Sequence, residues 1–361
     1  MKDLFIIHYY PIENYPPVLN LINILSERVK IIVCTTGNVK NSYIYKRSGV
    51  IIKRPCAMRS NVASLRYLYY LIVTLFQLVW RMPRNVMYYE PISVLPAYIY
   101  KRYINNKSRI YIHYHEYYPE SDYMRPGTRM WAINHRLERN WLYQNAEWVS
   151  QTNHRRLKMF LDNNTMVMKN IAHIFPNFPP KEWHVCCKSH RDRITRCVYV
   201  GSLSLKDTFV KEFCEWVCTK KGEVTFDIYS YNFHEETLDA INALNSPYIM
   251  FHKNGIPYSE IPKVLEHYDV GLLLYKANTI NFQWNETNKF YEYLICGLDV
   301  WYPKEMLLLH EMEKSKFAPK IIEVDFKNIK IELAQSKEVD NTTYSCFADE
   351  IYQDFYKHIC Q

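Results

Sequence analysis

Short apolar runs alternate with amphipathic stretches along the first half of the chain. Residues 4–7 and 30–35 are almost entirely apolar, as expected of parallel strands that are covered on both faces. The stretches 18–25 and 93–103 carry apolar residues at helical spacing, and the first of them follows Pro16 and Pro17. Strands that alternate with helices in this way predict an α/β fold built on a parallel sheet.

The second half of the chain repeats this pattern. Apolar runs at 197–200, 224–230 and 248–252 predict a second set of strands. Pro179 and Pro180 begin a polar linker between the two sets, and 361 residues are enough for two domains of ordinary size. We therefore expect a first domain over residues 1–180 and a second over 181–343, followed by a helical stretch at 344–361.

The stretch 285–301 has the clearest local pattern. Thr287 or Asn288 can cap a helix, and Gly297 stands where a left-handed residue ends one. Glu292 lies one turn beyond Asn288. The free amides of such a helix start suit a diphosphate, and a carboxylate one turn further in can accept both hydroxyls of a ribose. An ordinary amphipathic helix with a polar face explains the same spacing.

A second polar cluster follows the apolar run that begins at Arg109. His113 and His115 share one face of a strand by its period of two, and Glu116 comes next. These side chains fit acid–base chemistry or the binding of sugar hydroxyls. A pair of structural histidines bonded to neighbouring loops is an equal alternative.

Several ordered blocks resemble the GT-B glycosyltransferases, in particular family 4-like enzymes. Residues 288–300 read NKFYEYLICGLDV, similar to the family's Pro-Asn-Lys-Leu-Phe-Glu-Tyr-Leu-Ala-Ala-Gly-Leu-Pro-Val. Residues 115–120 (HEYYPE) resemble its His-Glu-Tyr-Phe-Pro-Glu block. Further matches are 137–139 (LER), 146–153 (AEWVSQTN), 176–179 (PNFP), 254–262 (NGIPYSEIP) and 268–275 (YDVGLLLY).

This resemblance implies two Rossmann-like domains that face each other across a cleft, with the terminal helix packed back on the first. It implies that His115 and Glu116 are catalytic, near the sugar and acceptor. The donor-binding residues that it implies are Gly201, Ser202, Lys206, Gly255, Ile256, Pro257, Thr287, Asn288, Lys289 and Glu292. The family's second glutamate, eight residues before Glu292, is replaced by Trp284, and Glu286 or Asn285 are candidates to substitute for it.

Charge is distributed unevenly between the two halves. Residues 1–180 hold 24 Lys and Arg against 10 Asp and Glu, whereas residues 181–361 hold 21 against 27. A basic half suggests an anionic partner. Nucleic acid is not expected, because no zinc-finger, homeodomain or RNP-type motif is present. We expect peripheral contact with an anionic membrane through the basic N-terminal domain.

The longest apolar run, residues 67–80, is too short to be a convincing membrane span. We favour a buried helix of the first domain, and a helix that lies in the membrane interface is the alternative. The first residues lead straight into a strand without a signal peptide, and the scattered cysteines suit reduced thiols. We therefore expect a cytoplasmic protein, at the inner face of the cell membrane if it contacts lipid.

No cofactor is expected besides a UDP- or GDP-linked sugar as donor substrate. The chain contains no Asp-x-Asp pair and no metal site is expected, so helix amides and cations such as Lys206 and Lys289 would stabilise the leaving diphosphate.

The expected function is therefore that of a hexosyltransferase with a saccharide or polyprenyl-linked acceptor, in cell-surface polysaccharide biosynthesis. The resemblance implies a retaining reaction, although the residues leave an inverting one open. The alternatives are a GT-B-fold sugar-nucleotide epimerase and a catalytically silent nucleotide-sugar-binding protein.

Overall fold

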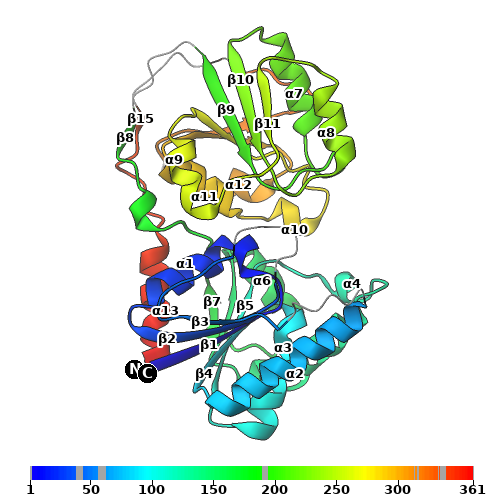
Figure 1. Ribbon diagram of the computed structural model, residues 1–361, viewed down its shortest axis with the longest axis vertical. Coiled ribbons are helices and arrows are strands. Elements are labelled where there is room, and N and C mark those ends of the chain that lie inside the picture. Colours follow the sequence, from blue (N-terminus) through cyan, green and yellow to red (C-terminus); the bar gives the residue numbers. More distant parts are fainter. Residues whose placement is uncertain are drawn as a thin grey trace. The chain divides into compact units, whose positions relative to one another are not determined.

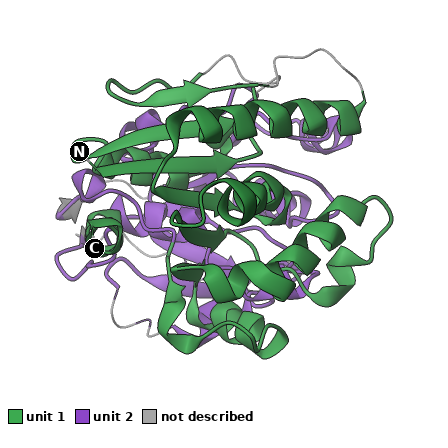
Figure 2. Cartoon of the chain, turned by 90° about the horizontal axis from the view of Figure 1, so that it is seen from below, with its two compact units in different colours: residues 1–176, 348–361 green, residues 177–347 purple. Residues whose placement is uncertain are grey.

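The computed structural model describes residues 2–37, 44–55, 62–188, 194–312, 314, 317–331, 333 and 339–360. The chain divides into two compact units, residues 1–176 with 348–361 and residues 177–347 (Figure 2). The expected boundaries stood at 180/181 and 343/344. The C-terminal helix begins only at Ala348, because Tyr344 and Phe347 are buried in the apolar core of the second unit.

Unit 1 is built on a seven-stranded sheet in which every pairing is parallel, with the order β3-β2-β1-β4-β5-β6-β7. The strands are β1 Lys2–His8, β2 Val29–Thr35, β3 Ile51–Lys53, β4 Asn85–Tyr89, β5 Arg109–Tyr114, β6 Trp148–Gln151 and β7 Ala172–Ile174. The continuous apolar runs at β1 and β2 are buried, as their sequence predicts.

Helices pack on the sheet of unit 1 (Figure 1). They are α1 Pro16–Leu25, α2 Ala63–Arg81, α3 Val94–Ile99, α4 Glu120–Tyr123, α5 Arg129–Leu137 and α6 His154–Asn163. The expected helix at 93–103 is split, because α3 passes at Tyr100–Ile104 into a wider π-helical turn.

The C-terminal helix α13 (Ala348–Cys360) belongs to unit 1, although it follows the whole of unit 2 in sequence. The Tyr352 hydroxyl donates to the Pro17 carbonyl at 2.8 Å, and Lys2 Nζ donates to the Cys360 carbonyl at 2.7 Å. These bonds hold both ends of α13 against the first strand and helix of the chain.

Helix α2 has two contrasting faces, so it is only partly the buried helix that the sequence favoured. Tyr67, Tyr70, Thr74, Gln77 and Leu78 are buried on one side. The opposite side exposes large apolar residues to solvent. By length and composition alone α2 is long and apolar enough to cross a membrane, and 28% of its apolar window is buried inside the structure.

Unit 2 repeats the architecture with a six-stranded parallel sheet of order β11-β10-β9-β12-β13-β14. Its strands are β9 Thr195–Val200, β10 Val224–Tyr229, β11 Ile249–His252, β12 Val270–Leu272, β13 Asp299–Pro303 and β14 Ile321–Val324. A separate short ribbon pairs β8 Cys187–Lys188 with β15 Val339–Asp340 in antiparallel fashion. The helices are α7 Val210–Thr219, α8 Glu235–Asn242, α9 Ile261–Leu265, α10 Ile280–Gln283, α11 Asn288–Ile295 and α12 Leu307–Glu311.

Helix α11 packs so closely on this sheet that one strand position must be glycine. A Cβ on Gly271 of β12 would lie 2.2 Å from the Tyr293 ring. The Tyr293 hydroxyl in turn accepts a hydrogen bond from the Val200 amide at 3.1 Å, at the carboxyl end of β9. The contact therefore fixes the first turns of α11 beside the edge of the sheet where parallel strands end. The predicted α/β architecture with two parallel sheets is confirmed.

Candidate active site

The start of α11 in unit 2 has the predicted form with one difference. Phe290, Tyr291, Leu294 and Ile295 are buried, and Gly297 ends the helix with φ +79°. Thr287 occupies the capping position in extended conformation, but its side chain makes no capping hydrogen bond. The Thr287 side chain therefore does not cap the first backbone amides of α11, which remain suited to binding an anion.

The Lys289 side chain lies directly over Gly201. A Cβ on Gly201 would come within 2.4 Å of Lys289 Cε and 2.9 Å of its Nζ, and Gly201 has φ +148°. Lys289 Nζ donates to the Tyr275 hydroxyl at 2.9 Å. Burial alone would lower the pKa of Lys289, but Tyr275 and the Glu292 carboxylate raise it. A half-buried, charged ammonium thus stands beside a glycine turn at the end of β9, which suits a phosphate.

Glu292 is buried one turn into the same helix. Its Oε1 accepts a hydrogen bond from the Asn288 side-chain amide at 3.2 Å. Burial raises the pKa of Glu292 to about 7, while Lys289 and Asn288 act against this shift. A buried carboxylate with a titration point near neutrality is a common mark of a binding or catalytic site.

Three of the other predicted donor residues lie on neighbouring loops of unit 2. The Ser202 hydroxyl accepts from the Asn232 side chain at 3.1 Å, and Tyr231, the residue before Asn232, packs against Gly255. Gly255 has φ +62°, and an added Cβ would lie 2.9 Å from the Tyr231 ring. Ile256 packs against the apolar core that contains α11. The structure therefore connects the Gly201 and Gly255 turns through residues 231 and 232.

Two predicted donor residues, Pro257 and Lys206, have no described side-chain contact with the start of α11. Pro257 is exposed and precedes a single 3-10 turn at Tyr258–Glu260. Lys206 is exposed, and only its backbone carbonyl takes part in a described hydrogen bond, from the Asn278 side chain at 3.3 Å. Lys289 is thus better placed beside Gly201 than Lys206 is.

Glu286, one of the two candidates for the glutamate that Trp284 replaces, is buried and already has hydrogen-bond partners. Its carboxylate accepts a hydrogen bond from the Tyr291 hydroxyl, and its carbonyl accepts from the Asn177 side chain at 3.4 Å. These contacts anchor the loop before α11. They give Glu286 a structural role whether or not it also contacts a sugar.

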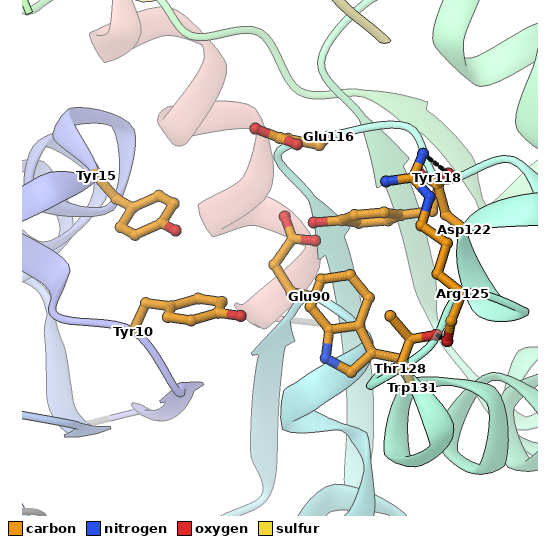
Figure 3. A pocket seen from close by; sticks show the side chains of 9 residues that line it. All are labelled: Tyr10, Tyr15, Glu90, Glu116, Tyr118, Asp122, Arg125, Thr128 and Trp131. Atoms are coloured by element: carbon orange, nitrogen blue, oxygen red, sulfur yellow. Dashed lines mark hydrogen bonds and ion pairs between the residues drawn. The ribbon is translucent and has the colours of Figure 1, made fainter. Parts of the chain in front are cut away.

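Unit 1 contains a cavity of about 380 Å³ at the carboxyl edge of its sheet (Figure 3). Figure 3 shows Tyr10 and Tyr15 on one side of this space, with the Glu90 carboxylate and the Tyr118 ring opposite them. The full lining is Tyr10, Tyr15, Glu90, Glu116, Tyr118, Asp122, Arg125, Thr128 and Trp131. Aromatic rings with carboxylates between them suit a saccharide, whose CH faces stack on rings and whose hydroxyls need acceptors.

The two predicted catalytic residues are placed differently. Glu116 lines the cavity. His115 is buried beneath it, stacked on Tyr89 with ring centroids 4.9 Å apart and in contact with His113 at 5.0 Å. Burial, together with the charges of His113, His8 and Arg156, holds the pKa of His115 well below its usual range. His115 is therefore neutral at physiological pH and is packed as part of an aromatic cluster.

Glu90 is a cavity residue that the sequence did not single out. It follows β4, with φ +65° and ψ 154°, a conformation that side chains other than glycine adopt only under strain. Its Oε1 accepts a hydrogen bond from the His115 amide at 2.7 Å. Burial raises the pKa of Glu90 to about 8. The hydrogen bond with the Tyr118 hydroxyl acts to lower this pKa, and the charge of Glu116 acts to raise it. At neutral pH the Glu90 carboxyl is thus mainly protonated.

One signal in the sequence points to Glu90 in retrospect. It is a carboxylate placed directly after an apolar strand and directly before Pro91. Because β4 and β5 are neighbours in the sheet, their carboxyl ends bring Glu90 beside His115 and Glu116. No group of three His, Cys, Asp or Glu side chains in the described parts of the chain could hold a metal ion.

Comparison with known proteins identifies the fold. No family model and no curated protein sequence matches the chain. Sucrose-phosphate synthase from Thermosynechococcus elongatus superposes with a TM-score of 0.63 at 9% identity, over 91% of this chain and 87% of that one. Anabaena Alr3699/HepE, in complex with UDP-glucose, gives 0.60 at 10% identity, over 87% and 83%.

The UDP-GlcNAc 2-epimerase of Methanocaldococcus jannaschii gives 0.58 at 11% identity, over 99% of this chain and all of that one. These structures share the arrangement of two parallel α/β sheets, and the chain has the GT-B fold. At such identities the likeness establishes the fold alone.

Proposed function

We propose that this protein is a glycosyltransferase that moves a sugar from a nucleotide-sugar donor to a saccharide acceptor. The observation that carries the proposal is the group at the start of α11, where Glu292, Asn288 and Lys289 lie beside the Gly201 turn. Lys289 and the first amides of α11 bind the diphosphate, and the Glu292 carboxylate accepts hydrogen bonds from the ribose hydroxyls. HepE, which shares the fold, was solved with UDP-glucose, so a UDP-sugar is the first donor to test.

The cavity of unit 1 supports an acceptor. Trp131 and the two tyrosines supply stacking surfaces, and Glu116 accepts hydrogen bonds from sugar hydroxyls. In the transfer, the bond between the anomeric carbon and the phosphate oxygen breaks, and a bond from that carbon to the acceptor oxygen forms. The acceptor hydroxyl loses its proton as the diphosphate departs with the electron pair.

Neither Glu90, which lines the cavity, nor the buried His115 is set up as a general base at neutral pH. Glu90 holds its proton up to a pKa of about 8, and the pKa of the buried His115 lies well below its usual range, which leaves a weak base. This favours a retaining reaction in which the departing phosphate oxygen accepts the proton. We extend the proposal to a hexosyl donor and to a free or polyprenyl-linked saccharide acceptor in cell-surface polysaccharide assembly.

A sugar-nucleotide epimerase is the second candidate, because the epimerase of Methanocaldococcus jannaschii matches over the whole chain. An epimerase converts its nucleotide sugar without any acceptor. A transferase releases nucleotide faster when the acceptor is present, and the aromatic lining around Trp131 favours this outcome.

Thermal unfolding with UDP, GDP, ADP, CMP and UDP-sugars tests the donor site. Ligand at a hundred times its Kd adds about 2.7 kcal/mol to stability, which raises Tm by roughly 5–10 °C for a unit of this size. We expect one nucleotide to stabilise the wild type and Glu90→Gln alike, and Glu292→Gln much less. Glu90→Gln is the matched control, because it changes a buried carboxylate in the other unit. Equal stabilisation of all three proteins would place the nucleotide elsewhere.

A further inference from the structure

Helix α2 carries an apolar stripe that none of the described residues of unit 1 covers. Leu65, Leu68, Ile72, Phe76, Val79 and Trp80 are each between 46% and 67% exposed. Their spacing of three, four, four, three and one places them on one side of the helix, within an arc of about 120°. A soluble protein rarely exposes so many large apolar side chains together, and such a patch marks an interaction surface.

The opposite face of α2 is tied to the core of unit 1. The Tyr70 hydroxyl donates to the Cys34 carbonyl at 3.2 Å, and the Tyr67 hydroxyl donates to the Ile92 carbonyl at 3.1 Å. Leu78 is fully buried. The helix cannot leave the sheet to cross a membrane without exposing these groups, so whatever binds the stripe meets α2 lying along the surface of the unit (Figure 1).

Positive charge surrounds the stripe. Arg66, Arg81 and Arg84 lie on or just after α2, and the Arg81 guanidinium stands 5.0 Å from the centre of the Trp80 ring. The adjoining segment Tyr100–Ile104, which packs against α2, adds Lys101 and Arg102 and exposes Tyr103.

Carboxylates are almost absent from this part of the sequence. Between Arg28 and His115 the only one is Glu90, whose side chain is buried in unit 1. This long segment therefore brings no exposed carboxylate to the stripe. Two carboxylates from elsewhere in unit 1 lie near its cations: Asp3, whose Oδ1 accepts from the Arg84 amide at 3.4 Å, and Glu147, whose charge acts on Lys101.

We propose that the apolar stripe of α2 docks flat onto an anionic lipid bilayer. The apolar side chains enter the boundary between headgroups and acyl chains, and the arginines contact the lipid phosphates around it. Trp80 and Tyr103 are the residue types that favour this interface. The excess of cations along this segment favours an anionic membrane over a second copy of this chain, whose own stripe would bring the same positive charge.

Membrane docking is independent of the transfer reaction, and it is measured without any nucleotide sugar. The purified full chain is mixed with phosphatidylcholine vesicles, with and without phosphatidylglycerol, and floated on a density gradient. We expect the wild type to float only with the anionic vesicles and to dissociate at high salt, because screened charges no longer attract it.

The double variant Phe76→Ser/Trp80→Ser tests the stripe. Because both side chains are exposed, it should fold with an unchanged Tm and bind anionic vesicles at least about tenfold more weakly. The matched control is Met250→Ser/Leu307→Ser, which removes two exposed apolar side chains of unit 2 and should bind as the wild type does. Replacing the exposed Arg84 and Arg102 by Gln should also weaken binding to anionic vesicles.

Two outcomes would overturn the proposal. One is wild-type protein that stays unbound with anionic vesicles at low salt. The other is a double variant that binds them as tightly as the wild type. A dimer in solution that the same double variant abolishes, with no vesicle binding, would assign the stripe to a second copy of this chain.

Discussion

The Lys289 side chain lies across Gly201 so closely that any Cβ at residue 201 would meet its Cε at 2.4 Å. The glycine turn after β9 and the first turn of α11, 88 positions apart in the sequence, therefore form one surface in unit 2. This contact joins a cation, a flexible turn and free helix amides, which together suit a diphosphate.

Gly201→Ala should weaken the binding of a nucleoside diphosphate by about tenfold, since the new Cβ pushes the Lys289 ammonium away from its place over the turn. The strained φ at residue 201 should also lower the free energy of unfolding by about 1 kcal/mol. Calorimetric titration with the diphosphate and with the corresponding nucleoside checks the mechanism. If both ligands lose affinity equally, Lys289 does not act through the phosphates.

Donor affinity should depend on pH through Glu292. The charged carboxylate accepts the ribose hydroxyls, and its pKa in the free protein is about 7. Because protonation below this pKa competes with binding, affinity should rise by about tenfold between pH 6 and pH 8. In Glu292→Gln the affinity should be weaker and nearly independent of pH over that range. A wild-type Kd that is constant from pH 6 to pH 8 would contradict this role.

Glu90 should make the protein less stable as the pH rises. Its folded pKa of about 8 lies above the unfolded value of about 4.5, so the folded state holds the proton more tightly. Stability from this group is complete below the unfolded pKa and is lost as the pH rises through the folded pKa. The full loss is on the order of 5 kcal/mol.

Glu90→Gln removes this titration. We expect the free energy of unfolding of Glu90→Gln, relative to that of the wild type, to increase steadily between pH 5 and pH 8. Urea unfolding at several pH values measures this difference, with Glu27→Gln, which changes an exposed carboxylate of the same unit, as the control. A difference that stays constant across the range would show that Glu90 is ionised in the folded protein.

Trp131→Ala should impair the acceptor and leave the donor unaffected. A stacked aromatic ring contributes about 0.5–1.5 kcal/mol, so the acceptor KM should rise by roughly three- to tenfold. Trp141→Ala, a half-buried tryptophan of the same unit outside the cavity lining, is the matched control. Equal changes in acceptor KM for the two variants would point to a general loss of structure in unit 1.

Local patterns in the sequence predict the parts of the site that one segment builds. Asn288 and Glu292 are one helical turn apart, so their hydrogen bond follows from helix geometry once α11 is recognised. Gly297 likewise marks the end of α11 by its left-handed conformation. Strands β1, β2, β9, β10 and β11 likewise follow from their apolar runs, whereas β7 and β14 were not predicted.

The cavity of unit 1 could not be predicted in the same way, because the order of the strands builds it. Tyr10 follows β1, Glu90 follows β4 and Glu116 follows β5, and they meet because the sheet places these three strands side by side. The sequence pattern alone also predicted the same catalytic role for His115 and Glu116. The packing of His115 against Tyr89 separates them, and that depends on β4.

The stripe on α2 shows a third limit of sequence patterns. The run from Tyr67 to Trp80 has apolar residues on every side, so periodicity could not tell which face the sheet covers. Tyr67 and Tyr70 mark the buried face only through bonds to Ile92 and Cys34, which lie on other elements.

Release of nucleotide from a nucleotide sugar, with and without an acceptor saccharide, tests the central claim most directly. We predict that the wild type releases nucleotide slowly without acceptor and faster with it. Each additional nucleotide released with acceptor should be matched by one molecule of extended saccharide. Glu292→Gln should lose this activity. No release and no binding of any UDP- or GDP-sugar by the wild type would contradict the account, as would conversion of the donor to its epimer at a rate that acceptor does not change.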